Sequence, residues 1–317
     1  DGFDLGVGAL HLLTRTDVER RLSINAIGPV WDGNEVWLVT GGGALFAAFP
    51  EVYATVFSGF YIAFFLFLAA LIFRAVAIEF RSKLPLAWWR NMWDVSFSTG
   101  SVLAALLLGV ALGNIAWGIP LDERGVFAGT FFGLLHPYAL LTGVTTVALF
   151  TMHGSIYLHL KTEGDLQAQV RTWIRPCMIF FVVSYALLTM ATLIYVPRAS
   201  AAVRDHPSLF IVVALSILAI ANIPREIFFQ RAGRAFLSSS ATVVLVMALF
   251  GLNTFPEMVH SNPMAENSLT AYNASSSQKT LTIMFIIAAI GMPIVVAYTL
   301  SIYWVFRGKV TLTESSY

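Results

Sequence analysis

The sequence contains few charged residues. Of its 317 residues only 12% are charged, about half of the ~25% that is usual in soluble globular domains, whereas 57% are hydrophobic. A single core of this size cannot enclose so much apolar surface, so most of that surface must face lipid. The composition therefore excludes a soluble protein and indicates an integral membrane protein.

The sequence also has only one cysteine, Cys177. A single thiol excludes an intrachain disulfide and any metal or iron–sulfur site that needs several cysteines. The net charge of +1 says little about partners, and we expect no nucleic-acid partner. Because the chain begins at Asp1, without an initiator methionine or a signal-peptide pattern, we expect that a further segment precedes it.

Eight apolar runs are long enough to cross a bilayer, which takes about 20 residues per helix. We predict an all-α, polytopic transmembrane helix bundle that forms one integral-membrane domain, 1–317. Strands are not expected, because the runs are continuously apolar rather than alternating. The first two spans should form a hairpin broken at Pro50-Glu51. The predicted spans are 34–49, 52–73, 95–117, 137–160, 174–196, 207–223, 236–255 and 280–306.

The positive charges are distributed very unequally between the two sides of these spans. Only four of the 19 Lys and Arg residues fall on one side, namely Arg124, Arg198, Arg204 and Lys279. Loops rich in Lys and Arg stay in the cytoplasm, so we predict a cytoplasmic C-terminus. Successive loops alternate between the two sides of the membrane. Counting back from the C-terminus, residues 1–10 are then the cytoplasmic end of an earlier, truncated ninth helix.

Several charged residues lie where a membrane makes them costly. At the bilayer centre a charged side chain costs ~2.5–3.5 kcal/mol or more, so each needs a compensating interaction or a function. They occur in DGFD at 1–4, in GPVWDGNEVW at 28–37 and around the end of the second span. The candidate residues are Asp1, Asp4, Asp32, Arg74, Glu79 and Lys83.

Two interpretations of these residues remain open. In the structural one, Asp32 is a first-turn acid that favours the helix dipole, and Arg74, Arg81 and Lys83 are anchors that reach the interface. In the functional one, the acids line a wet proton path from the cytoplasm, because carboxyls exchange protons readily when burial raises their pKa. Lys83 would then collect protons, and Arg74 would keep a neighbouring acid ionised.

The six histidines are poorly placed for haem ligation. His153 and His159 lie six residues apart on one predicted helix and so point to different faces, whereas a transmembrane cytochrome needs axial ligands on facing helices deep in the bundle. We therefore expect no haem, metal or other cofactor to be bound by this chain.

Residues 28–61 read GPVWDGNEVWLVTGGGALFAAFPEVYATVFSGFY. This segment closely resembles the signature of subunit II of the cytochrome bd-type quinol oxidases, W-D-G-N-x-V-W-L-x-x-x-G-A-L-F-A-A-x-P. The similarity extends back through the D-x-E-R-R run at 17–21 to DGFDLGVG at 1–8. It extends forward through FRAVAIEFRSK at 73–83 and WRNMWD at 89–94, and returns at 267–281. It is dense over the first third of the chain and sparse beyond.

The resemblance implies a role in a heterodimeric oxidase of the bacterial cytoplasmic membrane. Such an oxidase takes electrons from membrane quinol and reduces dioxygen to water. Its haems and quinol site belong to subunit I, and subunit II is a nine-helix protein that stabilises subunit I and contributes to a cytoplasmic proton pathway. Membrane lipid and quinone are expected around the complex, and small accessory subunits remain an open question.

The resemblance also assigns pathway residues by motif. The acid of W-D-G-N is Asp32, the acid and lysine of the R-S-K region are Glu79 and Lys83, and the leading acids are Asp1 and Asp4. Glu79 departs from the aspartate of the family at that position, which keeps the chemistry but changes the reach of the carboxyl.

Two other classes of function compete with this assignment. A proton- or ion-coupled secondary transporter also uses intramembrane acids and broken helices. A membrane cytochrome would bind haem itself. A transporter would be stable alone, whereas an oxidase subunit should depend on its haem-bearing partner.

Overall fold

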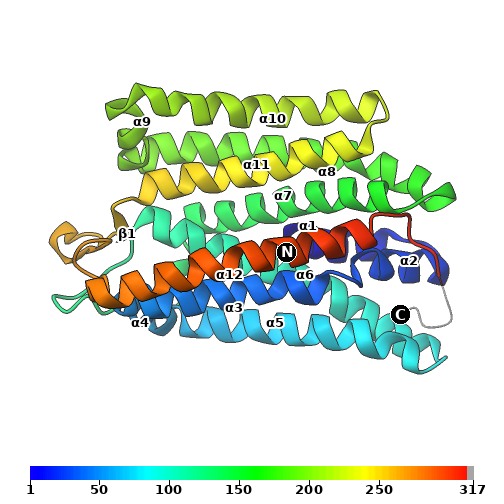
Figure 1. Ribbon diagram of the computed structural model, residues 1–317, viewed down its shortest axis with the longest axis horizontal. Helices are drawn as coiled ribbons and strands as arrows, with labels where there is room; N and C mark the ends of the chain where they lie inside the picture. Colours follow the sequence, from blue (N-terminus) through cyan, green and yellow to red (C-terminus); the bar gives the residue numbers. More distant parts are fainter. Residues whose placement is uncertain (313–317) are drawn as a thin grey trace.

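The computed structural model describes residues 1–312, which form a bundle of long, aligned helices (Figure 1). The α-helices are α1 (Gly2–Leu10), α2 (Asp17–Ile27), α3 (Trp31–Ala48), α4 (Pro50–Gly59), α5 (Tyr61–Phe80), α6 (Ala87–Trp117), α7 (Pro137–Lys161), α8 (Gly164–Tyr195), α9 (Ala201–Asp205), α10 (Phe210–Phe228), α11 (Ala232–Thr254) and α12 (Gln278–Val305). Short 3-10 helices lie at His11–Leu13, Arg81–Lys83, Phe132–Leu135, Pro197–Ser200, Pro207–Leu209 and Ala265–Asn267. One antiparallel strand pair is formed by β1 (Glu257–Val259) and β2 (Leu269–Thr270).

Within residues 1–312, seven helices are long and apolar enough to cross a membrane. This confirms the prediction of an all-α, polytopic bundle. The helix at the first predicted span, α3, has 18 residues and carries Asp32 and Glu35 near its start, and it is not among the seven. Helix α1 continues through His11–Leu13 as a shorter apolar helix. The seven are Tyr61–Lys83, Ala87–Trp117, Pro137–Lys161, Gly164–Tyr195, Pro207–Phe228, Ala232–Thr254 and Gln278–Val305.

The predicted second span, 52–73, has the wrong bounds. Helix α4 ends at Gly59, and α5 starts at Tyr61 after a non-helical Phe60. Gly59 lies so close to the ring of Phe127 that an added Cβ would stand 2.8 Å from it. The prediction ended the span before Arg74 because that residue is charged. The helix continues to Phe80 because Arg74 finds a partner inside the bundle.

The bundle is built around α1, which packs against both α6 and α7. Helices α5, α6, α7 and α8 pack in chain order, and α10 and α11 form an outer hairpin next to α7 (Figure 1). Helix α2 lies at one end of the bundle, while the loop 118–136 and the β1–β2 pair cover the other end (Figure 1). We call these the α2 end and the β1 end.

Glycines allow α1 to approach α7 very closely. A Cβ added to Gly6 would lie 1.8 Å from the carbonyl oxygen of Phe150, and one added to Gly154 would lie 2.5 Å from the backbone of Gly6. Helices in lipid gain much of their association energy from such small-residue contacts, because backbone packing replaces the hydrophobic effect. The central position of α1 therefore depends on these two glycines.

Helices α3 and α12 lie side by side on one face of the bundle, and neither has a fully buried residue (Figure 1). Helix α12 is fixed mainly at its ends. At the β1 end Ser276 donates to Ala47 O (2.6 Å) and Ala48 O (2.8 Å). At the α2 end Lys161 donates to the carbonyl oxygens of Phe306 and Gly308, and Lys309 donates to those of Leu160 and Thr162.

Substitution of either contact glycine should loosen the bundle. Gly→Ala inside a helix normally stabilises by up to about 1 kcal/mol. At Gly6 or Gly154 the added methyl group overlaps the facing backbone, so we expect a net loss of about 1–3 kcal/mol. Thermal unfolding of the purified protein in detergent measures the change. Gly251→Ala on α11 is the control, since an added Cβ there meets nothing within 4 Å. Equal melting temperatures for Gly6→Ala and Gly251→Ala would contradict this account of the packing.

Candidate functional site

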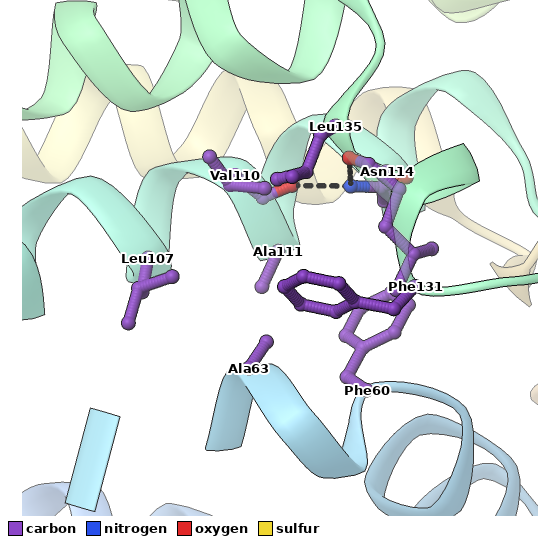
Figure 2. A pocket seen from close by; sticks show the side chains of 9 residues that line it. Phe60, Ala63, Leu107, Val110, Ala111, Asn114, Phe131 and Leu135 are labelled. Atoms are coloured by element: carbon purple, nitrogen blue, oxygen red, sulfur yellow. Dashed lines mark hydrogen bonds between the residues drawn. The ribbon is translucent and has the colours of Figure 1, made fainter. Parts of the chain in front are cut away.

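Two hollows near the β1 end lack the groups needed for acid–base chemistry. Figure 2 shows the narrower one, an apolar crevice in which the amide of Asn114 donates to the carbonyl oxygens of Val110 and Leu134 at 2.8 Å each. The wider hollow, about 230 Å³, has His136 as its titratable lining residue. Neither brings an acid together with a base, so the candidate site lies elsewhere.

A cluster of buried polar side chains lies inside the helix bundle, next to α1. The side chain of Asp4 is completely buried, and its Oδ2 accepts a hydrogen bond from Asn34 Nδ2 at 2.6 Å. Asn34 Oδ1 in turn accepts from the Tyr303 hydroxyl at 3.3 Å. The carboxyl is thereby connected to both α3 and α12, the two exposed helices.

Arg74 is the cation of this cluster. It is completely buried on α5 and forms an ion pair with Glu35 of α3. Its guanidinium also lies 5.9 Å from the ring of Trp31 and 5.7 Å from that of Phe97, both at cation–π distance. Asp4 interacts electrostatically with the same guanidinium. We call Asp4, Asn34, Glu35 and Arg74 the inner cluster.

Several polar atoms of this region are buried without a hydrogen-bond partner in the described chain. They are Asp4 Oδ1, both carboxyl oxygens of Asp1, and Arg74 Nε and Nη2. Buried polar atoms in native proteins are almost always bonded to protein or to ordered water. The inner cluster therefore has the composition of a site that takes up water or another polar group.

The structure brings together only some of the residues predicted from the sequence. Asp1, Asp4 and Arg74 belong to the buried region. Asp32 is exposed on α3, close enough to Glu35 for their charges to interact. Glu79 and Lys83 are exposed at the α2 end, beyond the inner cluster. The sequence motif thus marks both a buried group and a surface group.

Sequence reasoning did not select Glu35 and Asn34 as site residues. Both stand in the same W-D-G-N-E motif as Asp32, so the motif itself contained the signal. Helix α3 exposes Asp32 and turns Glu35 toward Arg74, so the motif carboxyl that pairs with the arginine is three residues further along the helix than Asp32. Only the packing of α3 on α5 distinguishes the two acids.

A second charged network surrounds Asp94, which is 1% exposed. Its Oδ1 accepts from His11 Nε2 at 2.6 Å and from Arg81 Nε at 2.5 Å. Its Oδ2 accepts from Arg20 Nη1 at 2.7 Å and from Arg81 Nη2 at 3.2 Å. Arg81 also donates to Asp17 at 2.8 Å. We call these five residues the Asp94 network.

The structural interpretation, in which Arg81 and Arg74 are anchors that reach the interface, does not fit their burial. Arg81 is 1% exposed and Arg74 is completely buried. A buried guanidinium is tolerated only when carboxylates and further hydrogen bonds compensate for its lost hydration. Asp94 and Asp17 supply them for Arg81, and Glu35 with Asp4 supplies them for Arg74.

His153, which lies within the predicted span 137–160, is used in packing. His153 Nδ1 lies 2.8 Å from Ser239 Oγ, and its ring stacks on Phe236 with centroids 5.0 Å apart. Among residues 1–312, no three His, Cys, Asp or Glu side chains form a group that could hold a metal ion.

Removing the Arg81 guanidinium should destabilise the chain far more than removing its exposed neighbour. Arg81→Met leaves Asp94 and Asp17 short of donors, and breaking a buried ion pair costs about 3–5 kcal/mol. Lys83→Met, two residues away on the surface, should change stability by less than about 0.5 kcal/mol. Thermal unfolding in detergent compares the two. Equal losses would mean that Arg81 is the surface anchor that the sequence suggested.

Comparison with known proteins agrees with the sequence motif. The family model for cytochrome bd terminal oxidase subunit II matches residues 1–306. Subunit 2 of the cytochrome bd-I ubiquinol oxidase of Escherichia coli is 39% identical, over 98% of this chain and 90% of the relative. Subunit 2 of the cytochrome bd ubiquinol oxidase of Bacillus subtilis is 35% identical, over 99% of this chain and 92% of the relative.

The fold agrees as well. A chain of the bd oxidase from Geobacillus thermodenitrificans superposes with a TM-score of 0.77, covering 96% of this chain and 92% of that one, at 15% identity. The match of the family model over nearly the whole chain, together with relatives above 30% identity, decides the assignment. The chain belongs to the cytochrome bd terminal oxidase subunit II family.

Proposed function

We propose that this chain is the haem-free subunit of a respiratory quinol oxidase and supplies a cytoplasmic proton route for the reduction of dioxygen to water. Family membership supports the first part and opposes the alternative of a secondary transporter. The inner cluster supports the second part, because Asp4 and Arg74 are completely buried and carry polar atoms that have no hydrogen-bond partner among the residues that the structure describes. Wet, buried acids are the groups that exchange protons inside a membrane.

The proposed topology follows the positive-inside rule. In the bundle, the α2 end gathers the segments that hold most of the Lys and Arg residues, so we assign this end and the C-terminus to the bacterial cytoplasm. Helix α3 then makes an eighth span and α1 the end of a ninth, all within one integral-membrane domain, 1–317.

The proposed cofactor assignment leaves the haems to the partner, subunit I. His153, the predicted-span histidine that lies further from the end of α7, already bonds Ser239 and stacks on Phe236, which supports a haem-free chain. Quinol is then a substrate of the complex rather than a ligand of this subunit. Accessory subunits and bound lipid or quinone would belong to the same complex.

The proposed route runs through three groups of residues, an entrance, a buried group and an outlet. Lys83 and Glu79 are exposed at the α2 end, where they attract and exchange cytoplasmic protons. Asp1, Asp4 and Arg74 form the buried group, in which the guanidinium favours the ionised form of the neighbouring carboxyls. Asp32 is the outlet, because it is exposed on α3 next to Glu35.

Protons that leave through Asp32 must reach the haem-bearing partner, so the partner should contact this chain near Asp32. The exposed face of α3 and α12 is suitable for this contact. A Cβ added at Gly41 or Gly43 of α3, or at Gly291 of α12, would meet nothing within 4 Å in this chain. Small residues on a membrane helix allow another helix to approach closely. We therefore place subunit I on this face, where it would cover Asp32.

Removing the proton-exchanging carboxyl should stop turnover without disturbing assembly. Asp32→Asn and Asp4→Asn keep the side-chain volume but cannot release a proton. We expect each to lower quinol-driven oxygen consumption by about 100-fold in the assembled complex, since a positioned proton-transfer group contributes ~10²–10⁴-fold. An oxygen electrode measures the rate per haem. Asp165→Asn is the control, because Asp165 is an exposed first-turn acid of α8 at the same end of the bundle. An assembled Asp32→Asn complex that consumes oxygen at the parent rate would exclude Asp32 from the route.

A bulky residue on α3 should prevent association with the partner. Gly41→Leu places its side chain in open space, so the chain should fold normally and yet keep the partner helix at a distance. We expect little haem to copurify with the tagged Gly41→Leu chain. Gly251→Leu on α11 meets equally open space on another face and should copurify haem at the parent level. Equal haem content in both variants would mean that the partner binds elsewhere.

A further inference from the structure

The turn between α10 and α11 lies where two membrane spans meet. The span Pro207–Phe228 ends at this turn, and the span Ala232–Thr254 begins directly after it, so that only residues 229–231 separate the two. The hydrocarbon core of a bilayer ends where its spans end, and the headgroup region lies immediately outside. The turn therefore lies at the depth of the lipid headgroups.

The turn is also at the outer edge of the bundle. It belongs to the α2 end, and α10 is the outermost helix on its side (Figure 1). The buried residues of α10 are only Ser216, Ile223 and Glu226. At the turn, Phe228 and Phe229 are 78% and 52% exposed. Exposed apolar rings beside a membrane span are covered by lipid.

Two arginines stack on one of these rings. The guanidinium carbon of Arg225 lies 5.8 Å from the centroid of Phe229, and that of Arg231 lies 5.4 Å from it. Arg225 is in the last turn of α10, and Arg231 directly precedes α11. Between them the chain reverses at Gln230, which has a φ of 58°. The ring thus orients two planar, permanently charged groups that come from the two sides of the turn.

The turn has a surplus of positive charge. Glu226 is the only acid in the segment 225–234, and its Oε1 accepts from Arg225 Nη1 at 3.2 Å. Within residues 1–312, neither Arg231 nor Arg234 forms an ion pair, and both are exposed. Three guanidiniums therefore share one buried carboxylate, and the surface of the turn is left positive.

We propose that the α10–α11 turn is a binding site for an anionic phospholipid, whose phosphate is held by Arg225 and Arg231 and whose acyl chains lie along the exposed face of α10. A guanidinium donates two parallel N–H bonds to a phosphate, and a stacked guanidinium loses little freedom when it does so. The exposed ring of Phe228 lies on the membrane side of the turn, where acyl chains would cover it. The site shares no residue with the proposed proton route, so a failure of that route would leave lipid binding unchanged.

A purely topological role for these arginines makes a different prediction. Arginines that only keep a loop in the cytoplasm act through their charge, and lysine serves equally well. A site that grips a phosphate depends on the planar fork of the guanidinium and on its stacking, which the compact ammonium of lysine does not reproduce. Replacement of arginine by lysine therefore separates the two roles at constant net charge.

The assembled complex in detergent, titrated with lipid and observed by native mass spectrometry, tests the proposal. The probes are phosphatidylglycerol and phosphatidylcholine with the same acyl chains, since both carry a phosphate but the choline cation opposes the arginines. We expect the parent to bind phosphatidylglycerol more tightly by about fivefold or more. The double variant Arg225→Lys/Arg231→Lys should lose about fivefold in affinity for phosphatidylglycerol, because two oriented guanidiniums are gone.

A second variant and a matched control complete the test. Phe229→Leu keeps both arginines but removes the ring that orients them, and it should weaken binding of phosphatidylglycerol in the same way. Because Phe229 is exposed, this variant should fold normally, which thermal unfolding of the complex checks. Arg15→Lys is the control, since Arg15 is exposed before α2 and not at the turn, and its affinity should equal that of the parent.

Three results would overturn the proposal. Parental affinity in Arg225→Lys/Arg231→Lys would reduce the arginines to diffuse positive charge, and an equal loss in Arg15→Lys would show that the turn is not the site. Displacement of phosphatidylglycerol by excess inorganic phosphate, with phosphate itself stabilising the parent but not the double variant, would make the ligand a soluble anion rather than a lipid.

Discussion

The structure depends on the compensation of arginines that are buried at membrane depth. A guanidinium there is stable only next to carboxylates, because the interior screens charge weakly and hydrates it poorly. Arg74 joins α5 to α3 through Glu35, and Arg81 joins the end of α5 to α6 and α2 through Asp94 and Asp17. These ion pairs fix the helices that carry the acids. The same interactions therefore hold the bundle together and fix the positions of its buried acids.

The two charged clusters have different electrostatic characters. Around Asp94, arginines from two elements and one histidine saturate a single carboxylate, which favours a fixed charge. The inner cluster has fewer internal bonds, and within residues 1–312 Asp4 Oδ1 and two guanidinium nitrogens of Arg74 have no hydrogen-bond partner. Phe97 separates the two with an apolar ring. The hydrogen-bonding capacity of Asp94 is thus saturated by its neighbours, whereas that of the inner cluster is not.

The chain on its own leaves one face of the bundle incomplete. Helices α3 and α12 have no buried residue, and α12 is held at its ends by Ser276, Lys161 and Lys309 rather than along its length. In lipid this arrangement costs little, since apolar side chains are as well solvated by acyl chains as by protein. Asp32 lies on this face. Membership of an oxidase subunit II family implies a partner subunit, and such a partner gives a physical reason for both the bare helices and the exposed acid.

The sequence by itself determined the membrane class, the helical fold, the unequal distribution of charge and the family, because composition, run length and a long motif are local properties. It also selected Asp4 and Arg74, since charges inside apolar runs are conspicuous. Tertiary structure alone decided the break at Phe60, the burial of Arg81, the choice of Glu35 over Asp32 as the partner of Arg74, and the pairing of His11 with Asp94. The partners in these pairs stand 13 to 83 residues apart in the sequence. Which carboxylate neutralises which cation depends on how helices pack, and a one-dimensional pattern does not contain that information.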